Sequence, residues 1–316
     1  MIFLQRRGMA TPNFLIIGAA RSGTTALSHF LSQHPEVFFC SPKEPHFLAL
    51  ANQKLDFKGP GDEDMMNNRA IVSPDKYFQL FEKSGSAKAI GEGSVSSLYY
   101  YQSAIANIQQ YVPQAKMIVV LRNPIDRAYS SFMYMTARGY EPLSDFGKAL
   151  DEEEARIAQG WHHIWHYTRM GFYHDRLRAF FDAFGRERVR VYLFDRMHAE
   201  KAKTLEDIYD YLGIDKSFQA ETDSEINKSG KPKSKLIQSM MKSIGSVSWL
   251  REGIKSLVPL TIRDKIRSAN LRDEKMPAEI RERLTKIYSN EIERVSNLLN
   301  INLSHWLQQN RSGIVD

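Results

Sequence analysis

The sequence predicts an α/β protein with a central, mostly parallel sheet, helices on both faces of the sheet and a helical C-terminal part. Short apolar runs bounded by turn residues predict buried strands, and the amphipathic segments between them predict helices. Strands that alternate with helices favour a parallel sheet covered on both faces. The predicted strands span residues 14–18, 36–40, 87–92, 116–122 and 188–194.

Start and stop signals define the predicted helices. The first begins at the glycine loop that follows residues 14–18 and ends at Pro35. Another begins at Pro124, with Asn123 as the expected N-cap. Residues 141–186 are predicted to be mainly helical, a further helix is predicted to end near Gly213, and residues 236–308 are predicted to be helical with a basic middle.

The composition is that of an ordinary globular protein. The 316 residues are 42% hydrophobic and 25% charged. Because no run approaches the roughly 18 consecutive apolar residues of a membrane span, we expect a soluble protein. We interpret residues 1–11 as a disordered leader, too weakly apolar for a signal peptide, and residues 12–316 as one domain.

The cysteine content and the net charge exclude some kinds of cross-link, metal site and partner. Cys40 is the only cysteine, which excludes an intrachain disulfide and a cysteine-based zinc cluster and fits a cytoplasmic location. The net charge is +6, from 43 Lys and Arg against 37 Asp and Glu. This charge suits an anionic ligand, but it is mild and its basic residues are scattered, so we expect no nucleic-acid partner.

The stretch "FLIIGAARSGTT", residues 14–25, leads from a predicted strand into a loop with Gly18 and Gly23. A loop between a strand and a helix N-terminus offers backbone N–H groups and the positive end of the helix dipole to a phosphate. An ATP-binding Walker loop has its lysine where this sequence has Thr24, whereas here Arg21 supplies a cation inside the loop. A tight turn without a ligand is the alternative interpretation.

A second candidate anchor lies in "KMIVVLRNPIDRAYSSFMYM". Arg122 leaves the end of a predicted strand, and Ser130 follows about two helical turns later. A guanidinium and a hydroxyl together form a charge-assisted clamp for a dianion. The alternative is that Arg122 caps a sheet edge and Ser130 is an ordinary helix residue. Arg127, on the same predicted helix, is left without a role.

These loops resemble those of the sulfotransferases that use 3′-phosphoadenosine 5′-phosphosulfate (PAPS). Segments such as "HPEVFFCSPKEPHFL", "GFYHDRLRAFFDAFGRERVRVYLFDRM" and "LSHW" extend the resemblance, to bacterial relatives of the glycan and heparan-type enzymes, over roughly residues 12–307. The resemblance implies a P-loop-like three-layer fold, PAPS as co-substrate, PAP as released product and no required metal. In the family's usual form a lysine takes the Arg21 position, so Arg21 is a departure.

The resemblance also implies which residues bind the nucleotide. The glycine loop would hold the 5′-phosphosulfate, Arg122 and Ser130 the 3′-phosphate, and the basic loop 226–235 would close over the nucleotide unless it is only a solvated linker. The implied cofactor-binding residues are Arg21, Ser22, Gly23, Thr24, Thr25, Arg122, Ser130, Ser229, Gly230 and Lys231.

A general base is needed because the acceptor loses a proton as it attacks sulfur. "SPKEPHFL" places Glu44 and His46 just after the second predicted strand, near the carboxyl edge of the sheet. The resemblance implies a glutamate base at Glu44 with a histidine nearby, so we expect Glu44 as base, His46 as an orienting or alternative base, and Arg21 as the cation at the leaving oxygen. An ion pair between Glu44 and Lys43 is the competing interpretation.

Two other polar segments have open roles. Ser94 and Ser96 follow the third predicted strand and either line the acceptor cleft or only form a turn. The aromatic stretch 161–173 is interpreted as a wall or lid over the acceptor, with ordinary helix packing as the alternative. His162 and His166 have the spacing of two metal ligands, but without a third candidate nearby we expect no zinc site.

The predicted function is transfer of the sulfuryl group from PAPS to a hydroxyl, or to an amine or amide nitrogen, of a small-molecule or carbohydrate acceptor. A P-loop nucleotide or small-molecule kinase is one alternative, and Thr24 in place of the Walker lysine counts against it. A non-catalytic nucleotide-binding relative is the other.

Overall fold

A computed structural model describes residues 10–222, 231–232, 271–272 and 275–308. The chain divides into two compact units. The first unit comprises Met1–Phe57, Glu63–Arg122 and Phe172–Ser224, and the second comprises Lys58–Asp62, Asn123–Gly171 and Glu225–Asp316. The expected leader falls almost wholly outside the described residues, and the single domain over residues 12–316 stays a prediction.

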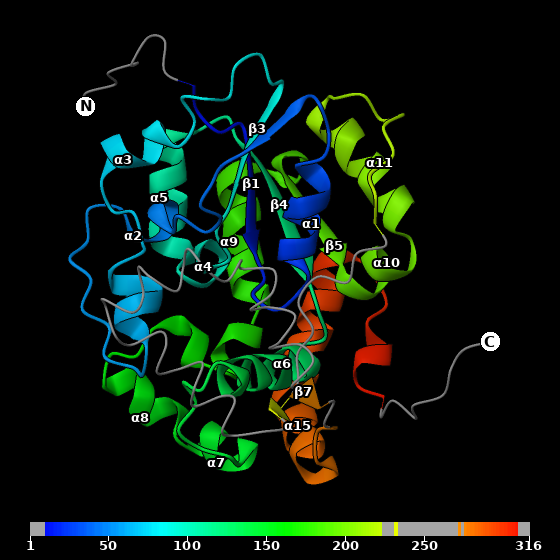
Figure 1. Cartoon of the computed structure of the whole chain (residues 1–316). Helices are drawn as coiled ribbons and strands as arrows, with labels where there is room; N and C mark the ends of the chain where they lie inside the picture. The colour runs from blue at the N-terminus through cyan, green and yellow to red at the C-terminus, as the bar shows by residue number, and fades with distance from the viewer. Residues whose placement is uncertain (1–9, 223–230, 233–270, 273–274, 309–316) are drawn as a thin grey trace. The chain divides into compact units, whose positions relative to one another are not determined.

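The first unit contains a five-stranded sheet in the order β2-β3-β1-β4-β5 (Figure 1). The strands are β1 (Phe14–Gly18), β2 (Val37–Phe39), β3 (Ala89–Gly93), β4 (Lys116–Leu121) and β5 (Val189–Leu193). All neighbouring pairs are parallel; Phe14, for example, lies opposite Gly91 of β3 and Lys116 of β4. The five predicted strands are confirmed, and because they are parallel, their carboxyl ends share one edge of the sheet.

Helices cover both faces of this sheet, as the alternating pattern predicts. Figure 1 shows α1 and α11 on one face and α5 and α9 on the other. The helices of the unit are α1 (Thr24–Leu31), α2 (Phe47–Leu50), α3 (Pro74–Gln79), α4 (Ser96–Tyr99), α5 (Tyr101–Tyr111), α9 (His174–Phe184), α10 (Phe194–Ala199) and α11 (Lys201–Leu212), with a π-helical turn at Glu63–Asn67 and a 3-10 turn at Arg186–Arg188.

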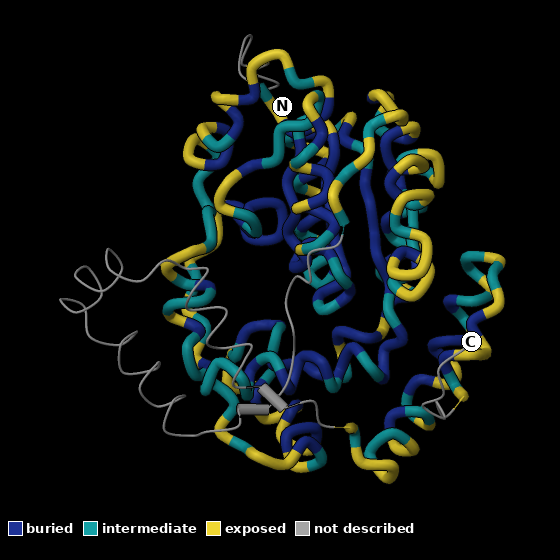
Figure 2. The backbone as a smooth tube through the Cα atoms, turned by 45° about the vertical axis from the view of Figure 1, so that its right-hand side comes forward, coloured by how far each residue is buried: buried dark blue, intermediate teal, exposed yellow. Residues whose placement is uncertain are grey.

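The strands form the core of the first unit. Every residue of β1 is buried, and the buried colour runs along the central strands in Figure 2. A parallel strand covered on both faces is apolar along its whole length, which explains the continuous run "FLIIG". Gly91 is needed beside it, since a Cβ there would lie 2.1 Å from Cζ of Phe14.

Two predicted helix boundaries match and one differs. Asn123 caps α6 (Pro124–Ala137), because its side chain accepts a hydrogen bond from the Ile125 N–H. Gly213 ends α11 in the left-handed conformation. By contrast, α1 ends at Leu31 rather than at Pro35, because backbone bonds from Gln33 and His34 back to residues three positions earlier tighten its last turn.

The second unit is mainly helical. It contains α6, α7 (Phe146–Asp151), α8 (Glu153–Ala158), α15 (Ala278–Leu299), 3-10 turns at His163–Trp165, Arg169–Gly171 and Ser304–Trp306, and a two-stranded antiparallel pair of β6 (Lys231–Pro232) with β7 (Leu271–Arg272). The prediction that residues 141–186 are mainly helical is confirmed by α7, α8 and α9, and between α8 and α9 the segment 159–173 holds two 3-10 turns. Of the predicted region 236–308, α15 and the turn at Ser304–Trp306 are helical, while 236–270 lies outside the described residues.

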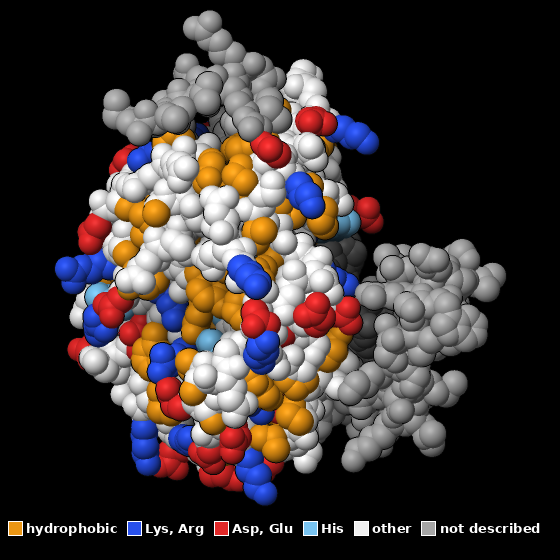
Figure 3. All heavy atoms as spheres, turned by 90° about the vertical axis from the view of Figure 1, so that its left-hand side faces the viewer, with side chains coloured by type: hydrophobic (Ala, Val, Ile, Leu, Met, Phe, Trp, Pro, Cys, Tyr) orange, Lys and Arg blue, Asp and Glu red, His pale blue; other side chains and the backbone are white. Residues whose placement is uncertain are grey.

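The surface carries charges of both signs. On the face drawn in Figure 3, Lys and Arg side chains are intermixed with Asp and Glu and form no extended patch of one sign. Among the described residues, no helix has the length and apolar character needed to cross a membrane.

Candidate active site

The carboxyl edge of the sheet in the first unit collects most of the predicted site residues. These residues lie in the segments that follow four of the five strands. The parallel topology therefore brings together side chains that are far apart in sequence. Arg21, Ser22, Gly23, Thr24 and Thr25 follow β1, Glu44 and His46 follow β2, Ser94 and Ser96 follow β3, and Arg122 follows β4.

The glycine loop leads directly into α1. Gly23 is the N-cap residue, with φ of 81°, and no side chain caps the helix. The left-handed φ favours glycine here, and a Cβ on Gly23 would also lie 3.1 Å from the Phe194 ring and 2.8 Å from the flexible Cε of Met197. Ser22 is 0% exposed, and its Oγ has no hydrogen-bond partner among the described residues. An uncapped helix start beside an orphan hydroxyl fits an anionic group.

The two predicted phosphate anchors are in contact. Nη1 of Arg122 donates a hydrogen bond to the carbonyl oxygen of Arg21 over 3.1 Å. The Arg122 guanidinium also lies over the Phe194 ring, 4.9 Å from its centroid. Its carbonyl oxygen accepts a hydrogen bond from the Tyr173 hydroxyl. Arg122 is therefore held by three separate contacts, of which the first joins its guanidinium to the glycine loop.

Glu44 lies between two basic side chains. Lys43 Nζ is 2.8 Å from Glu44 Oε1, and His46 Nε2 is 3.9 Å from Glu44 Oε2. Burial raises the pKa of Glu44, but the charges of Lys43, His46 and Arg21 and the Lys43 hydrogen bond outweigh burial, so this pKa lies below its usual value. The expected ion pair with Lys43 thus exists, and it leaves Oε2 on the side of His46.

His46 is held by two serines from the turn after β3. Its backbone N–H donates to Ser94 Oγ over 3.0 Å, and its Nδ1 is hydrogen-bonded to Ser96 Oγ at 2.8 Å. Ser94 Oγ in turn donates to Oε2 of Glu92, a buried carboxyl on β3. Glu92 was not among the predicted site residues, although a charged residue at the end of the predicted strand 87–92 was a usable signal.

Backbone strain concentrates at this edge. Arg21, Glu44 and His46 have φ of 65°, 62° and 59°, and they are three of the five non-glycine residues with positive φ in the described part of the chain. Each such residue costs of the order of 1 kcal/mol, so the surrounding contacts must hold it in place. Strain of this kind is found most often at functional sites.

The remaining predicted cofactor residues belong to the second unit. Ser130 is buried on α6, which belongs to the second unit. Lys231 lies in β6, opposite Arg272 of β7, while Ser229 and Gly230 fall outside the described residues. Their roles in nucleotide binding stay predictions.

Arg127, which was left unassigned, is completely buried within the second unit. Its guanidinium donates to Ser131 Oγ and to the carbonyl oxygen of Tyr167. These contacts fasten the segment 166–170 to α6. Arg127 therefore has a packing role in its own unit.

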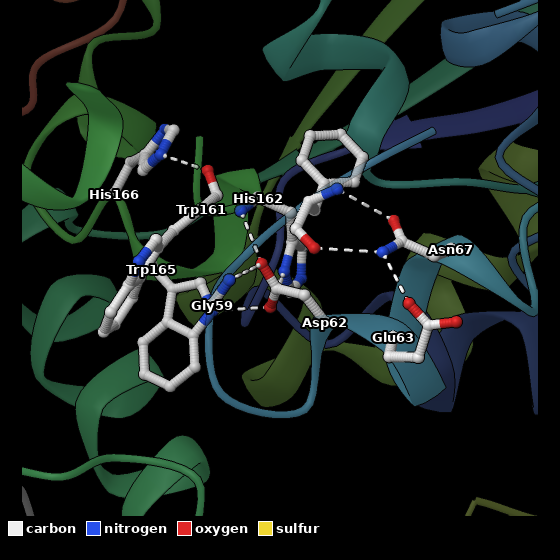
Figure 4. Close-up of polar contacts among 9 residues, drawn as sticks. Gly59, Asp62, Glu63, Asn67, Trp161, His162, Trp165 and His166 are labelled. Atoms are coloured by element: carbon white, nitrogen blue, oxygen red, sulfur yellow. Dashed lines mark hydrogen bonds and ion pairs between the residues drawn. The ribbon is translucent and has the colours of Figure 1, made fainter. Parts of the chain in front are cut away.

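Asp62 is the centre of a buried network in the second unit (Figure 4). Its carboxylate accepts hydrogen bonds from the Gly59 N–H, the His162 N–H, His162 Nδ1 and Trp165 Nε1, at 2.6 to 2.9 Å. Burial raises the pKa of Asp62, but the bonds from His162 and Trp165 outweigh it and the pKa is lowered. This network was not predicted, because Asp62 lies about a hundred residues from His162 and Trp165 in sequence.

The same network includes part of the histidine and aromatic stretch 161–173. His162 faces Asp62, whereas His166 Nε2 is hydrogen-bonded to the Trp161 carbonyl, and burial lowers the pKa of His166 to about 4. Trp165 and Tyr167 are fully buried, which supports packing rather than a lid for these two rings. In the described ranges, no group of three or more His, Cys, Asp or Glu side chains is arranged to hold a metal ion.

Comparisons with known proteins show which family the chain resembles in sequence and fold. The model of the "Sulfotransferase family" matches residues 12–219. The crystal structure of a sulfotransferase from Alicyclobacillus acidocaldarius superposes with a TM-score of 0.75 and 30% identity, covering 95% of this chain and 100% of that one.

Two groups of curated relatives are similar in sequence. Human carbohydrate sulfotransferase 15 is 29% identical over 175 residues, covering 45% of this chain and 30% of that protein. The bifunctional heparan sulfate N-deacetylase/N-sulfotransferase 2 of Bos taurus is 34% identical over 134 residues, covering 40% of this chain and 13% of that protein. The chain therefore spans less than a third of the length of these curated relatives.

Proposed function

The chain belongs to the sulfotransferase family, and we propose that it transfers the sulfuryl group of PAPS to a hydroxyl of a carbohydrate or another small metabolite and releases PAP. The observation that carries this proposal is the meeting of Arg122 with the glycine loop at Arg21, beside the ionised carboxylate of Glu44. A phosphate-binding loop, a second cation and a base at one sheet edge are the parts that sulfuryl transfer requires.

The glycine loop is assigned to the 5′-phosphosulfate of PAPS. The start of α1 directs backbone N–H groups and the positive end of the helix dipole toward an anion. Ser22, Thr24 and Thr25 add hydroxyls, and the unpartnered Oγ of Ser22 suits an acceptor oxygen of the ligand. Thr24 at the place of the Walker lysine disfavours phosphoryl transfer from ATP, which depends on that lysine.

Arg122 is assigned to the 3′-phosphate, with Ser130 as a second donor. A guanidinium offers paired donors that match phosphate oxygens. Phe194 and Tyr173 fix the position of Arg122, so little conformational freedom is lost when the anion binds. Lys231, with Ser229 and Gly230, is assigned to a basic loop over the nucleotide.

In the transfer step the acceptor oxygen attacks sulfur, the bond between sulfur and the phosphate oxygen breaks, and the acceptor proton passes to Glu44. Negative charge grows on the leaving phosphate oxygen. Arg21 and the N–H groups at the start of α1 stabilise that charge, and such preorganised donors contribute most when they face the transition state. In this proposal Glu44 accepts the proton of the acceptor, and Arg21 stabilises the charge on the leaving phosphate oxygen.

Glu44 is ionised over the neutral pH range, because its neighbours lower its pKa. Lys43 engages Oε1, so Oε2 is the oxygen assigned to the acceptor hydroxyl. His46 faces Oε2 and is assigned to orient it, and as a second basic group it is the alternative proton acceptor.

The acceptor class is proposed from the relatives. One relative is named a carbohydrate sulfotransferase and another a heparan sulfate N-sulfotransferase. We therefore propose a sugar hydroxyl as the first candidate acceptor and a sugar nitrogen as the second. Glu44 serves either acceptor, because hydroxyls and amines both lose a proton on sulfuryl transfer.

A ligand-binding experiment tests the nucleotide assignment. Thermal unfolding is followed with PAP, with ADP and with ATP plus magnesium. A ligand at a hundredfold excess over its Kd stabilises the native state by about 2.7 kcal/mol. We expect selective stabilisation by PAP; a preference for magnesium-ATP contradicts the proposal.

A turnover experiment tests the chemistry. Radiolabelled PAPS is incubated with pools of oligosaccharides and small metabolites, and the labelled product is identified. The variant Glu44→Gln keeps the shape of the side chain but removes its basicity, so turnover should fall at least about a hundredfold while PAP still binds. Turnover near that of the wild type removes Glu44 as the base.

A further inference from the structure

Glu92 is a buried carboxyl behind the site, and the proposed transfer gives it no role. It is the fourth residue of β3 and is 1% exposed. Burying a carboxyl group in a sheet costs free energy unless the group is hydrogen-bonded. In the described part of the chain, Ser94 supplies that hydrogen bond, from its Oγ to Glu92 Oε2 over 2.8 Å.

The bond to Glu92 sets the direction of the Ser94 hydroxyl. A hydroxyl has one proton to donate and two lone pairs that accept. Because the proton points to Glu92, a lone pair is left for the backbone N–H of His46, which lies 3.0 Å from Ser94 Oγ. Without the acceptor at Glu92, the hydroxyl is free to rotate and lose this arrangement.

His46 needs to be held, because its backbone lies in the left-handed region with φ of 59°. That conformation is unfavourable for a residue with a Cβ. Ser94 holds the backbone of His46, and Ser96 holds its ring through Nδ1, which turns Nε2 toward Glu44. Both serines follow Glu92 closely in sequence, Ser94 directly after β3 and Ser96 at the start of α4.

We propose that Glu92 is a positioning residue, which orients Ser94 and thereby fixes His46 and the Glu44 carboxylate beside it. The inference rests on the proposed function, in which Glu44 receives the acceptor proton. Glu92 itself is too deeply buried to touch an acceptor. Its effect reaches the reacting atoms only through the chain of contacts from Ser94 to His46 to Glu44.

The groups that face Glu92 set its pKa, and the strength of its hydrogen bond with Ser94 therefore depends on pH. They are Glu44 and Lys43 before α2, Cys40 after β2, and Tyr77 on α3. Burial, helped by the charge of Glu44 and opposed by the Ser94 hydrogen bond and by Lys43, raises the pKa of Glu92 to about 7. As the pH rises through this value, Glu92 ionises and its bond with Ser94 becomes charge-assisted and stronger.

Steady-state kinetics with matched variants test the proposal. Glu92→Met removes the acceptor at nearly constant volume, and Ser94→Ala removes the relay. We expect each to lower kcat about tenfold, with the Kd of PAP unchanged. The double variant should be no slower than the slower single variant, because both break one chain of contacts. Ser97→Ala is the control, since Ser97 is a buried neighbour whose Oγ has no hydrogen-bond partner among the described residues.

Glu92→Gln separates the charge from the shape. Its amide oxygen still accepts from Ser94, so kcat should stay within about threefold of the wild type at pH 6. The wild type should gain up to about fivefold in kcat between pH 6 and pH 8 relative to Glu92→Gln, which cannot ionise. Equal pH profiles of the two proteins, or additive losses in the double variant, overturn the proposal.

The imidazole NMR signals of His46, assigned with His46→Asn, report the same coupling without turnover. They should shift in Glu92→Met and in Ser94→Ala but not in Ser97→Ala. If the wild type transfers no sulfuryl group, the proposed function fails, and these signals still decide on the positioning. If Glu92→Met does not fold, the variants Ser94→Ala and Glu92→Gln still test the positioning role of Glu92. Unshifted His46 signals in Ser94→Ala overturn the inference.

Discussion

Arg122 donates a hydrogen bond to the carbonyl oxygen of Arg21 across 101 residues of sequence. The bond joins the end of β4 to the glycine loop after β1, which are neighbouring strands of the sheet. It uses one nitrogen of the guanidinium, and Phe194 covers the guanidinium face. This geometry and the buried carboxylates of Glu92 and Asp62 lead to five predictions.

Replacing Arg122 with lysine should weaken PAP binding about 10- to 100-fold, because the change removes the planar fork and its stacking on Phe194 while the charge remains. Isothermal titration calorimetry measures the Kd. Arg190→Lys is the control, since Arg190 pairs with Asp207 on the exposed side of β5. An unchanged Kd for Arg122→Lys contradicts the assignment of Arg122 to a phosphate.

Replacing Arg21 with lysine should leave kcat/KM within about threefold. The hydrogen bond from Arg122 is accepted by the backbone carbonyl of Arg21, which a lysine also has. Arg21 lowers the pKa of Glu44 through its positive charge, which a lysine also carries. Arg21→Met removes the charge and should cost about 10²- to 10³-fold, the range for a lost group that stabilises a developing anion. Equal activity of the lysine and methionine variants is the outcome that excludes an electrostatic role.

Gly23→Ala should abolish PAP binding and lower the free energy of unfolding by more than about 1 kcal/mol. A Cβ there meets Met197 at 2.8 Å, in addition to the strain of φ at 81°. Gly213→Ala is a matched control, because Gly213 has φ of 78° but no atom within 4 Å of its added Cβ. Urea unfolding compares the two, and an equal loss in both refutes the close approach at Gly23.

Glu92→Gln should become more stable relative to the wild type as the pH rises. The folded-state pKa of Glu92, about 7, lies above its unfolded value, so the stability it contributes is complete below the unfolded pKa and is lost as the pH rises through about 7. Between pH 5 and pH 8 the difference should shift by about 2 kcal/mol in favour of glutamine. Urea titrations at both pH values measure it, and no shift contradicts the raised pKa.

Asp62→Asn should destabilise the protein by about 3 kcal/mol at pH 7, since an amide nitrogen then faces donors that a carboxylate oxygen satisfied. The folded-state pKa of Asp62 is lowered, so its stabilisation is present above the unfolded pKa and is lost as the pH falls through the folded pKa. The deficit of the variant should therefore shrink in acid. Asp207→Asn, at a half-exposed position, is the control.

Much of the fold followed from local patterns. Apolar runs such as "FLIIG" and "KMIVVL" marked the strands, because a parallel strand must be buried along its length. Asn123 and Gly213 marked helix ends, because capping depends on one or two residues. The grouping of Arg21, Glu44 and Arg122 was also predictable, since parallel strands deliver the loops that follow them to one edge.

The sequence by itself thus determined the strand and helix pattern and the chemistry carried by the loops at the sheet edge. Only the tertiary structure decided which partners the polar side chains meet: Lys43 and His46 for Glu44, Ser94 for Glu92, and His162 for Asp62. Periodicity and capping are local properties that a short window of sequence contains. Hydrogen bonds and pKa shifts instead depend on burial and on how the folded backbone turns side chains toward one another, whether they are close in sequence, as Lys43 is to Glu44, or distant, as His162 is from Asp62.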